Sequence, residues 1–291
     1  MDGVIVLNKP WGCTSHDMVS FLRRLTKIRR IGHTGTLDPA ATGVLPICIG
    51  KATKAAELLT AADKAYRAEL VLGMTTDTLD AEGEILTEQP VSVSKEAFEK
   101  AIQKFIGEIE QIPPMFSAIK KDGKKLCDLA RAGIEVERKP RRVTIAEIRL
   151  LDFDEKQGIA SIEVFCSKGT YIRTLCEDIG MSLGCGAYMN RLERTKSGQF
   201  LLENSYTQEE LIKLAEEGTL ESVLTPVDAL FDYKPIILNR ELSQRVQNGA
   251  RIRYRGLCEN ERYRLYDENR SFLAISVYQE GRLVLEKSFW S

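Results

Sequence analysis

The segment Gly32–Leu45, which reads GHTGTLDPAATGVL, constrains this chain more than any other. It carries one carboxylate, Asp38, among three glycines and one proline, and its only other ionisable side chain is His33. Glycine adopts backbone angles that other residues avoid and lets another backbone approach closely. Pro39 restricts Asp38 to an extended conformation. The segment therefore predicts a rigid loop that presents a single aspartate. Proteins hold reactive groups in this way.

The rest of the chain shows the hydrophobic periodicity of alternating strands and helices. We expect strands at 4–7, 66–72, 143–150 and 159–165. We expect helices after a cap at Thr14 or Ser15, between Ser94 and Gly107, from Ile172 to Gly184, and after the capping box that begins at Thr207. Residues 111–142 combine proline, glycine and basic side chains, which predicts a long excursion from the core.

The sequence pattern changes at Pro235. Residues 236–291 hold short segments of alternating polarity, such as 251–254 and 272–278. This pattern is typical of a small β-domain. We therefore expect a main domain over residues 1–234 and a small second domain over residues 235–291.

The charge of the chain is segregated, although its net charge is only −1. Residues 23–30 carry five basic side chains and no acidic ones, and residues 118–142 carry nine basic and four acidic ones. Residues 203–232 instead carry eight acidic side chains and one basic one. A single basic segment is usually a solvated face, but two of them favour contacts with the phosphates of a nucleic acid.

The composition argues against several classes of protein. With 43% hydrophobic and 29% charged residues, the chain is typical of a soluble globular protein, and no apolar run approaches the ~20 residues of a membrane helix. The N-terminus lacks the features of a signal peptide. The seven cysteines form no CxxC pair and there are only two histidines. We therefore expect free thiols, no metal site, no catalytic Cys–His pair and a cytoplasmic location.

Four segments together resemble one known family. The loop at 32–45 resembles the catalytic loop of the TruB family, the tRNA pseudouridine synthases that modify the T-arm uridine. The segments NKPWGCTS at 8–15, QIPP with Ser117-Ala118 at 111–118, and SKGTYIRTL at 167–175 match the same family in the expected order. The resemblance covers roughly residues 3–230, and the tail more loosely.

The resemblance implies a fold and a domain organisation. The expected fold class is α+β, the pseudouridine synthase fold, with a mixed, mostly antiparallel sheet flanked by helices. The catalytic domain would occupy residues 1–234 and would contain an RNA-clamping insertion at about 108–142. Residues 235–291 would form a short PUA-like RNA-binding domain.

The resemblance also implies a reaction and three catalytic residues. Pseudouridine forms when the base of uridine leaves C1′ of its ribose and rejoins it through C5, without electron exchange and therefore without a cofactor. Asp38 would supply the carboxylate, which could attack the ribose, attack the base, or assist departure of the base and proton removal at C2′. Arg173 would hold Asp38 through a directional guanidinium contact. Tyr66 would stack on the flipped uracil and could transfer a proton.

Substrate-binding roles follow from the same resemblance. His33 would hold the flipped nucleotide or the loop around it, Tyr171 would contact the uracil edge, and Leu192 would line the pocket. Basic side chains would contact the RNA backbone and so offset the cost of extracting a base. In the first basic segment these are Arg23, Arg24, Lys27, Arg29 and Arg30.

Two positions depart from the family pattern. Cys127 stands where the family usually has tyrosine, and Glu193 stands where a basic residue is common. The first departure could soften packing in the insertion, and the second could weaken a phosphate contact. Neither touches the three expected catalytic residues.

Other functions stay open at this point. An RNA-binding or RNA-folding factor would use the same basic surfaces but would not need Asp38. A glycosidase-like hydrolase would usually need two working carboxylates, and the matching loop has one. Because the first motif lies near the start of the chain, we expect a stand-alone bacterial-type enzyme and not a partner of guide RNA. We expect it to act on the T-arm stem–loop of tRNA as a monomer without an obligate protein partner.

Overall fold

The computed structural model describes residues 1–117 and 119–290, so Ala118 of the second matching motif lies outside the described residues. The main domain is built on a nine-stranded sheet with the order β1-β3-β12-β4-β11-β10-β7, in which β2 pairs with β3 and β13 pairs with β12. Within this sheet β3 and β12 pair in parallel, and the other strand pairs are antiparallel. Its strands are β1 (Gly3–Lys9), β2 (Ile31–His33), β3 (Ala41–Ile49), β4 (Lys64–Leu72), β7 (Gly107–Gln111), β10 (Arg141–Asp154), β11 (Ile159–Cys166), β12 (Ala187–Ser197) and β13 (Phe200–Leu201). The four predicted strands are confirmed.

Four of the helices pack on one face of this sheet, where their apolar side chains form the main core. The main-domain helices are α1 (Ser15–Thr26), α2 (Ala56–Thr60), α3 (Lys95–Gln103), α5 (Ile172–Ser182) and α6 (Gln208–Glu216). The predicted caps are confirmed: Thr14 and Thr207 each form a capping box, and Ser94 accepts a hydrogen bond from the backbone of Ala97. The short strands β5 (Met74–Thr76) and β6 (Ile85–Glu88) form a separate hairpin.

The predicted end of the helix after Ser94, which is α3 in the structure, is wrong. The helix ends at Gln103 and not at Gly107, so Phe105 and Ile106 lie beyond it. Gly107 instead begins β7, which pairs with the start of β10. Phe105 and Ile106 continue the helical spacing of apolar residues, but the pairing of β7 with β10 ends the helix before them. Tertiary contacts here override local propensity.

The two halves of the sheet differ in what they bury. In β1, Ile5 and Leu7 face the main core, whereas Val4 and Val6 face a second apolar cluster on the opposite side. A strand that is buried on both faces has a continuous apolar sequence, and β1 reads GVIVLNK. In β4, by contrast, alternate residues such as Arg67 face solvent. The strands beside the Asp38 loop are therefore the most deeply enclosed.

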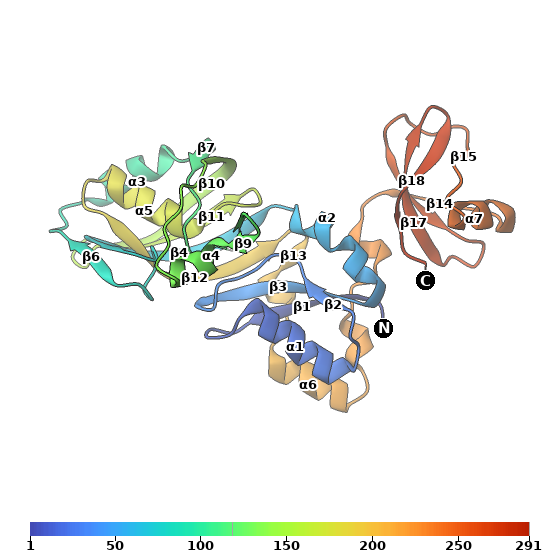
Figure 1. The fold of residues 1–291 in the computed structure, drawn as a ribbon, viewed down its shortest axis with the longest axis horizontal. Helices are drawn as coiled ribbons and strands as arrows, with labels where there is room; N and C mark the ends of the chain where they lie inside the picture. The colour runs from blue at the N-terminus through green and yellow to red at the C-terminus, as the bar shows by residue number, and fades with distance from the viewer. Residues whose placement is uncertain (118, 291) are drawn as a thin grey trace.

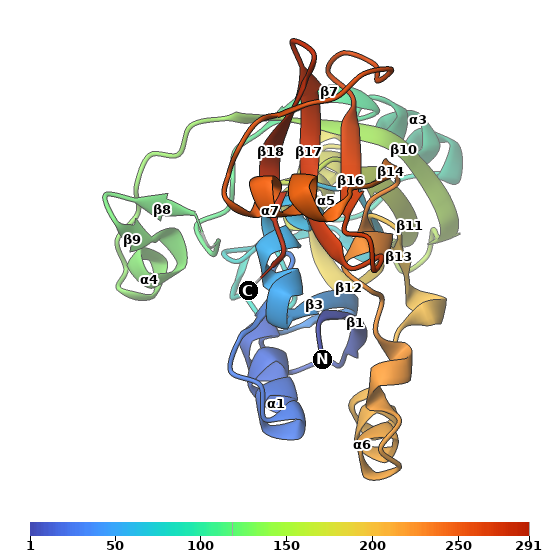
Figure 2. The ribbon, with the colours of Figure 1, turned by 90° about the vertical axis from the view of Figure 1, so that its right-hand side faces the viewer.

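The basic excursion leaves the sheet between β7 and β10. It contains the two-residue strands β8 (Lys120–Lys121) and β9 (Lys124–Lys125), followed by the short helix α4 (Leu126–Arg131). Figure 2 shows these elements projecting from one side of the main domain. Strand β7 belongs to the main sheet, so the segment that projects begins after Gln111.

The C-terminal residues fold into a small β-domain at one end of the molecule (Figure 1). Its five strands follow the order β14-β16-β17-β18-β15. They are β14 (Lys234–Ile237), β15 (Ile252–Arg253), β16 (Arg262–Tyr266), β17 (Phe272–Gln279) and β18 (Arg282–Ser288). The domain also contains helix α7 (Arg240–Gln247), capped by Asn239, which the sequence analysis missed.

Apolar packing joins the two domains. Ile275 and Phe289 of the C-terminal domain belong to the same cluster as Val6, Val44 and Phe231. Beside this cluster, Nζ of Lys54 donates to the backbone carbonyl of Trp290 at 3.0 Å. The junction is thus a continuation of the core that covers the outer face of β1 and β3.

Two findings bear on the classes of protein considered above. Among the helices of residues 1–117 and 119–290, none is long and apolar enough to cross a membrane. All seven cysteines are free, as predicted.

Candidate active site

Two buried side chains fix the loop that carries Asp38. Lys9, which is fully buried at the end of β1, donates from Nζ to the carbonyl oxygen of Ala41 at 2.7 Å. Ser15, at the start of α1, accepts a hydrogen bond from the N–H of Leu37 at 2.8 Å and donates one to its carbonyl at 3.1 Å. Hydrogen bonds therefore hold the loop on both sides of Asp38.

Arg173 links Asp38 to a second carboxylate. It lies in the first turn of α5, and its side chain is only 6% exposed. Its Nη2 lies 2.9 Å from Oδ2 of Asp38, and its Nη1 lies 3.2 Å from Oδ2 of Asp80. Nη2 also donates to the carbonyl of Phe116, near the base of the insertion, at 2.7 Å. The predicted contact between Asp38 and Arg173 is present, as part of a larger network.

Asp80 is held with its carboxylate toward Arg173. Its side chain is 10% exposed, and its Oδ1 accepts from the hydroxyl of Thr78 at 2.5 Å and from the N–H of Glu82 at 3.1 Å. The backbone of Asp80 pairs with Met189 of β12. Because these contacts occupy both carboxylate oxygens, Asp80 serves to orient the guanidinium of Arg173.

Strands β4 and β12 bring a second group of residues to the same place. Tyr66 on β4 lies directly opposite Arg194 on β12, and Leu192 lies opposite Ala68. Residues opposite each other on neighbouring strands project from the same face. Nη2 of Arg194 donates to the carbonyl of Gly35 at 3.2 Å, so this pair also borders the Asp38 loop.

One cavity of about 500 Å³ brings five predicted residues together. Asp38, Tyr66, Tyr171, Arg173 and Leu192 all line it. Basic side chains also contribute to its wall: Lys64, Arg141, Arg142, Lys168 and Arg194. The fold thus brings the predicted residues from separate strands, loops and a helix to one cavity.

His33 lines a neighbouring cavity and not this one. That cavity, of about 730 Å³, also contacts Asp38 and Arg173, and it includes Cys127 of α4. Nδ1 of His33 is buried and has no hydrogen-bond partner among the described residues. Burial, and then the charge of Arg194, lower the pKa of His33. A neutral imidazole therefore lines the same cavity as Asp38, where an incoming group could complete its hydrogen bonding.

Burial changes the titration of several groups that line the cavity and of Lys9, which holds the Asp38 loop. It raises the pKa of the Tyr66 phenol, with Arg194 as the strongest opposing influence. It also raises the pKa of Tyr171. Burial lowers the pKa of Lys64 to about 8, and it lowers the pKa of Lys9. The two lysines are 7% and 0% exposed and bind backbone carbonyls. Positively charged Lys64 and Arg194 therefore line the cavity together with Tyr66.

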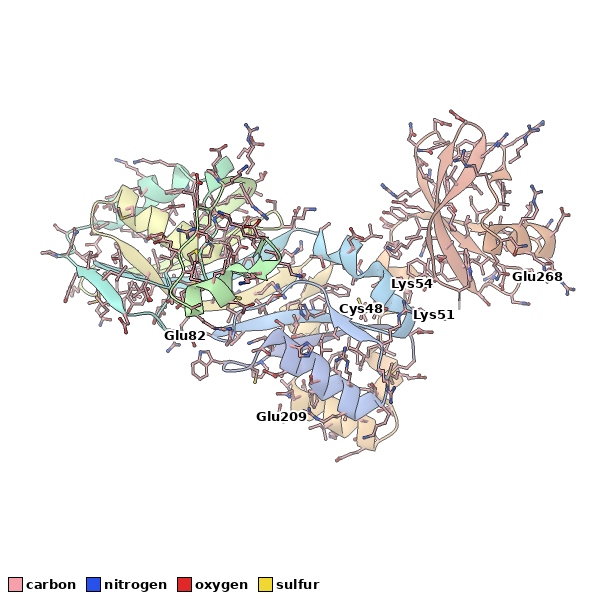
Figure 3. All side chains as sticks on the ribbon, in the orientation of Figure 1. Cys48, Lys51, Lys54, Glu82, Glu209 and Glu268 are labelled. Carbon is pink, nitrogen blue, oxygen red and sulfur yellow. The ribbon has the colours of Figure 1, made fainter. Side chains whose placement is uncertain are left out.

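The first basic segment lies outside both cavities. All five of its basic side chains are exposed, on the end of α1 and in the loop that follows. The charges of Arg30, Lys51 and Lys287 lower the pKa of Lys54 after the effect of burial, which places these four cations near one another. Figure 3 shows Lys51 and Lys54 beside the junction with the C-terminal domain. The basic surface thus extends further than the sequence analysis predicted.

Three residues of the site were missed: Asp80, Arg194 and Lys64. Asp80 lies in a turn-rich segment, TTDTLDAEG, whose three carboxylates were a usable signal. Lys64 directly precedes the Ala65-Tyr66 pair, so its proximity was available, but its burial was not. No three His, Cys, Asp or Glu side chains of the described residues converge as metal ligands.

Comparison with known proteins gives a consistent result. Residues 23–172 match the family model described as TruB family pseudouridylate synthase (N terminal domain), and residues 173–232 match the model described as tRNA pseudouridylate synthase B C-terminal domain. A tRNA pseudouridine synthase B of Geobacillus thermodenitrificans is 49% identical over 261 residues, which cover 87% of this chain and 86% of that protein. One of Cupriavidus metallidurans is 45% identical over 98% of this chain and 93% of its own length.

The fold has solved counterparts as well. A chain in the crystal structure of a Cbf5-Nop10-Gar1 complex superposes with a TM-score of 0.75 at 25% identity, covering 99% of this chain and 85% of that one. A chain in a structure of an H/ACA RNP bound to a substrate RNA has a TM-score of 0.74 at 23% identity, covering 99% of this chain and 85% of that one. The similarity extends through the C-terminal β-domain, beyond the residues that the family models match.

Proposed function

The chain belongs to the TruB family of pseudouridylate synthases, and from this premise we propose that it isomerises uridine to pseudouridine in tRNA, at position 55 of the T-arm. The observation that carries the proposal is the cavity that holds Asp38 against Arg173 at 2.9 Å, with Tyr66, Tyr171 and Leu192 in its wall. A cavity of about 500 Å³ has room for one flipped nucleotide.

Asp38 acts at the junction of sugar and base. Arg173 fixes one of its oxygens, and the side chain of Asp38 keeps 42% exposure, so it can still reach a bound nucleotide. The reaction breaks the C1′–N1 bond and forms the C1′–C5 bond, and the net result moves one proton from C5 to N1. Asp38 assists the first event, by attack or by proton removal at C2′, in a site that pre-orients its carboxylate.

The remaining residues hold the flipped base. Tyr66 supplies an aromatic face in place of the lost stacking neighbours. Tyr171 contacts the uracil edge, and Leu192 closes the apolar side of the pocket. His33 holds the nucleotide from the adjoining cavity, where its Nδ1 lacks a partner among the described residues.

The basic surfaces hold the RNA outside the pocket. The exposed cations of residues 23–30, the insertion between β7 and β10, and the small C-terminal domain, as a PUA-like module, contact the phosphates and offset the cost of base extraction. We further propose that the protein acts in the cytoplasm as a monomer, without an obligate protein partner and without a cofactor.

The alternatives have less support. A hydrolase of the two-carboxylate kind needs a second carboxylate that is available to the substrate, but both oxygens of Asp80 are occupied by Arg173, Thr78 and the backbone of Glu82. A factor that only binds or folds RNA has no use for the clamped Asp38.

The test uses a synthetic T-arm stem–loop tritiated at C5 of its uridines. The wild-type protein is expected to release tritium from the single T-loop uridine, and Asp38→Asn is expected to bind the RNA but release none. The matched control is Asp152→Asn, which removes an exposed carboxylate of β10. Binding by both proteins with release by neither would overturn the isomerase and favour the RNA-folding factor.

A further inference from the structure

Tyr66 and Arg194 form a cross-strand pair at the wall of the cavity. They are directly opposite in the register of β4 and β12, and both line the cavity that contains Asp38. Side chains in such a pair start about 4.5–5.5 Å apart at Cβ. The guanidinium of Arg194 is therefore within reach of the phenol of Tyr66.

Arg194 is buried without a carboxylate. It is 1% exposed, and it donates from Nε to the carbonyl of Val44 at 2.7 Å and from Nη2 to the carbonyl of Gly35 at 3.2 Å. Among the described residues it has no ion pair, whereas Arg173 has two. The neighbouring strand presses closely: a Cβ at Gly43, which has a φ of +98°, would lie 2.3 Å from the carbonyl oxygen of Arg194. The contact at Gly43 holds the backbone of Arg194, and the two hydrogen bonds hold its side chain.

A buried guanidinium without a counter-ion is costly to a fold. Two carbonyl oxygens accept hydrogen bonds from Arg194 but do not neutralise its charge. Burial raises the pKa of the neighbouring Tyr66 phenol, and the charge of Arg194 is the strongest influence that opposes this rise. The arrangement is therefore suited to a phenolate that exists only during turnover.

The reaction provides a reason for such a phenolate. As the C1′–N1 bond breaks, the departing base takes the bonding electrons and needs a proton. The phenol of Tyr66 can give its proton to that base and become a phenolate. After the C1′–C5 bond forms, the phenolate removes the proton from C5, and the electron pair of the C5–H bond restores the double bond of the ring. The phenol is regenerated, and the net change is the transfer of hydrogen from C5 to the base nitrogen.

We propose that Arg194 is a positioning residue for this relay, which holds the phenol of Tyr66 and stabilises its phenolate form while the base is detached. The inference rests on the proposed isomerase activity and adds a residue to it. Loss of a hydrogen bond to a charged group corresponds to a rate loss of roughly 10- to 100-fold. We expect Arg194→Gln to lower kcat by this factor, and to change RNA affinity little.

The test is a double-mutant cycle measured in single turnover with the tritiated stem–loop. Its variants are Arg194→Gln, Tyr66→Phe and the double variant, with RNA affinity measured by filter binding. If Arg194 acts through the phenol, the double variant is no slower than Tyr66→Phe alone. Arg194→Lys, which keeps the charge, restores most of the rate. The matched control is Arg67→Gln, which changes a solvent-facing arginine on β4, the strand of Tyr66. This control leaves the rate unchanged.

The outcomes separate the two proposals. Turnover by the wild type with multiplying losses in the double variant would overturn the role of Arg194 and leave the isomerase intact, because a merely structural clamp on Gly35 would act equally without the phenol. No turnover by the wild type would overturn both. If Arg194→Gln does not fold in a thermal melt, the cycle is run with Arg194→Lys. A rate of Arg194→Lys near that of wild type then supports the relay. If Arg194→Lys instead lowers the rate, and lowers it further when it is added to Tyr66→Phe, the relay is contradicted.

Discussion

Two buried arginines face the same cavity and are treated differently by the protein. Arg173 lies between Asp38 and Asp80, at 2.9 and 3.2 Å, so two carboxylates surround one guanidinium. Arg194 lines the same cavity, donates to two backbone carbonyls and has no carboxylate partner among the described residues. Lys9 and Lys64, on the side of Arg194, also bind carbonyls and have no ion pair among the described residues. One wall is therefore compensated in charge, and the other is positive.

The difference indicates two separate tasks. A guanidinium between two carboxylates fixes geometry, because each charge-assisted contact restrains the others. Cations held by carbonyls keep their field, and a preorganised field stabilises charge that develops during a reaction. The Arg173 wall thus orients the aspartate near the ribose, and the Arg194 wall favours the negative charge of the departing base. The first wall should be sensitive to shape and the second to charge.

Arg173→Lys is the strongest test of the first wall. Lysine keeps the positive charge but cannot contact Asp38, Asp80 and the Phe116 carbonyl at once. A displacement of about 1 Å costs roughly 10²-fold in rate, so we expect kcat to fall by that factor or more, with little change in RNA affinity. The measurement is single-turnover tritium release. A rate near that of wild type would show that charge alone is sufficient there, and would remove the distinction between the walls.

Asp80→Asn should have a smaller effect of the same kind. Arg173 would keep Asp38 and the Phe116 carbonyl but lose its second carboxylate, so we expect a loss of roughly tenfold in kcat and of about 1–3 kcal/mol in the free energy of unfolding. Denaturant unfolding and single-turnover kinetics measure the two effects. Asp77→Asn, in the same segment but bonded only to the backbone of Glu84, is the matched control and should change neither. Equal losses of rate and stability in Asp80→Asn and Asp77→Asn would show that the whole segment, and not the contact of Asp80 with Arg173, causes the effect.

The two walls also differ in how far the sequence revealed them. Asp38 and Arg173 lie in motifs whose residue types and order match the family, so the resemblance to the family predicted their pairing, which their distance along the chain could not show. Asp80 lies 93 positions from Arg173, outside those motifs, and only the fold shows that its carboxylate is turned inward. Arg194 was next to the noted Glu193, yet its role depends on the register that sets it opposite Tyr66. Register across distant strands is not encoded in a local pattern.

The same limit explains the errors in the fold. Periodicity predicted strands β1, β4, β10 and β11 and the capped helices, because each strand contains its own apolar pattern and each of these helices its own cap, but it did not predict β3 or β12. Helix α7 was missed because it has few apolar positions, with Leu242 and Val246 four residues apart, among residues that otherwise read as short strands. The early end of α3 depends on the pairing of β7 with β10, which no local feature announces.

Lys64→Met tests the second wall through pH. Because burial lowers the pKa of Lys64 to about 8, the wild-type cavity loses one positive charge as the pH rises through 8. We expect kcat/KM to decline through that pH toward the value of the variant, whose profile should lack the step. The difference at pH 7 should be roughly threefold to tenfold, or about 1 kcal/mol. Tritium release measured from pH 6.5 to 9.5 shows whether the step is present.

Lys64→Met should raise the stability of the folded protein although it lowers the rate. Between pH 8 and 10.5 the unfolded chain retains the proton of Lys64 while the folded protein does not, so the cost of burying this lysine is full below pH 8 and decreases above it. Lys64→Met should therefore be more stable than wild type at pH 7, by up to about 3 kcal/mol, and the advantage should shrink above pH 8. Lys156→Met, in an exposed turn, controls for loss of charge alone. If Lys64→Met raises stability while leaving the rate unchanged, the positive wall needs only Arg194.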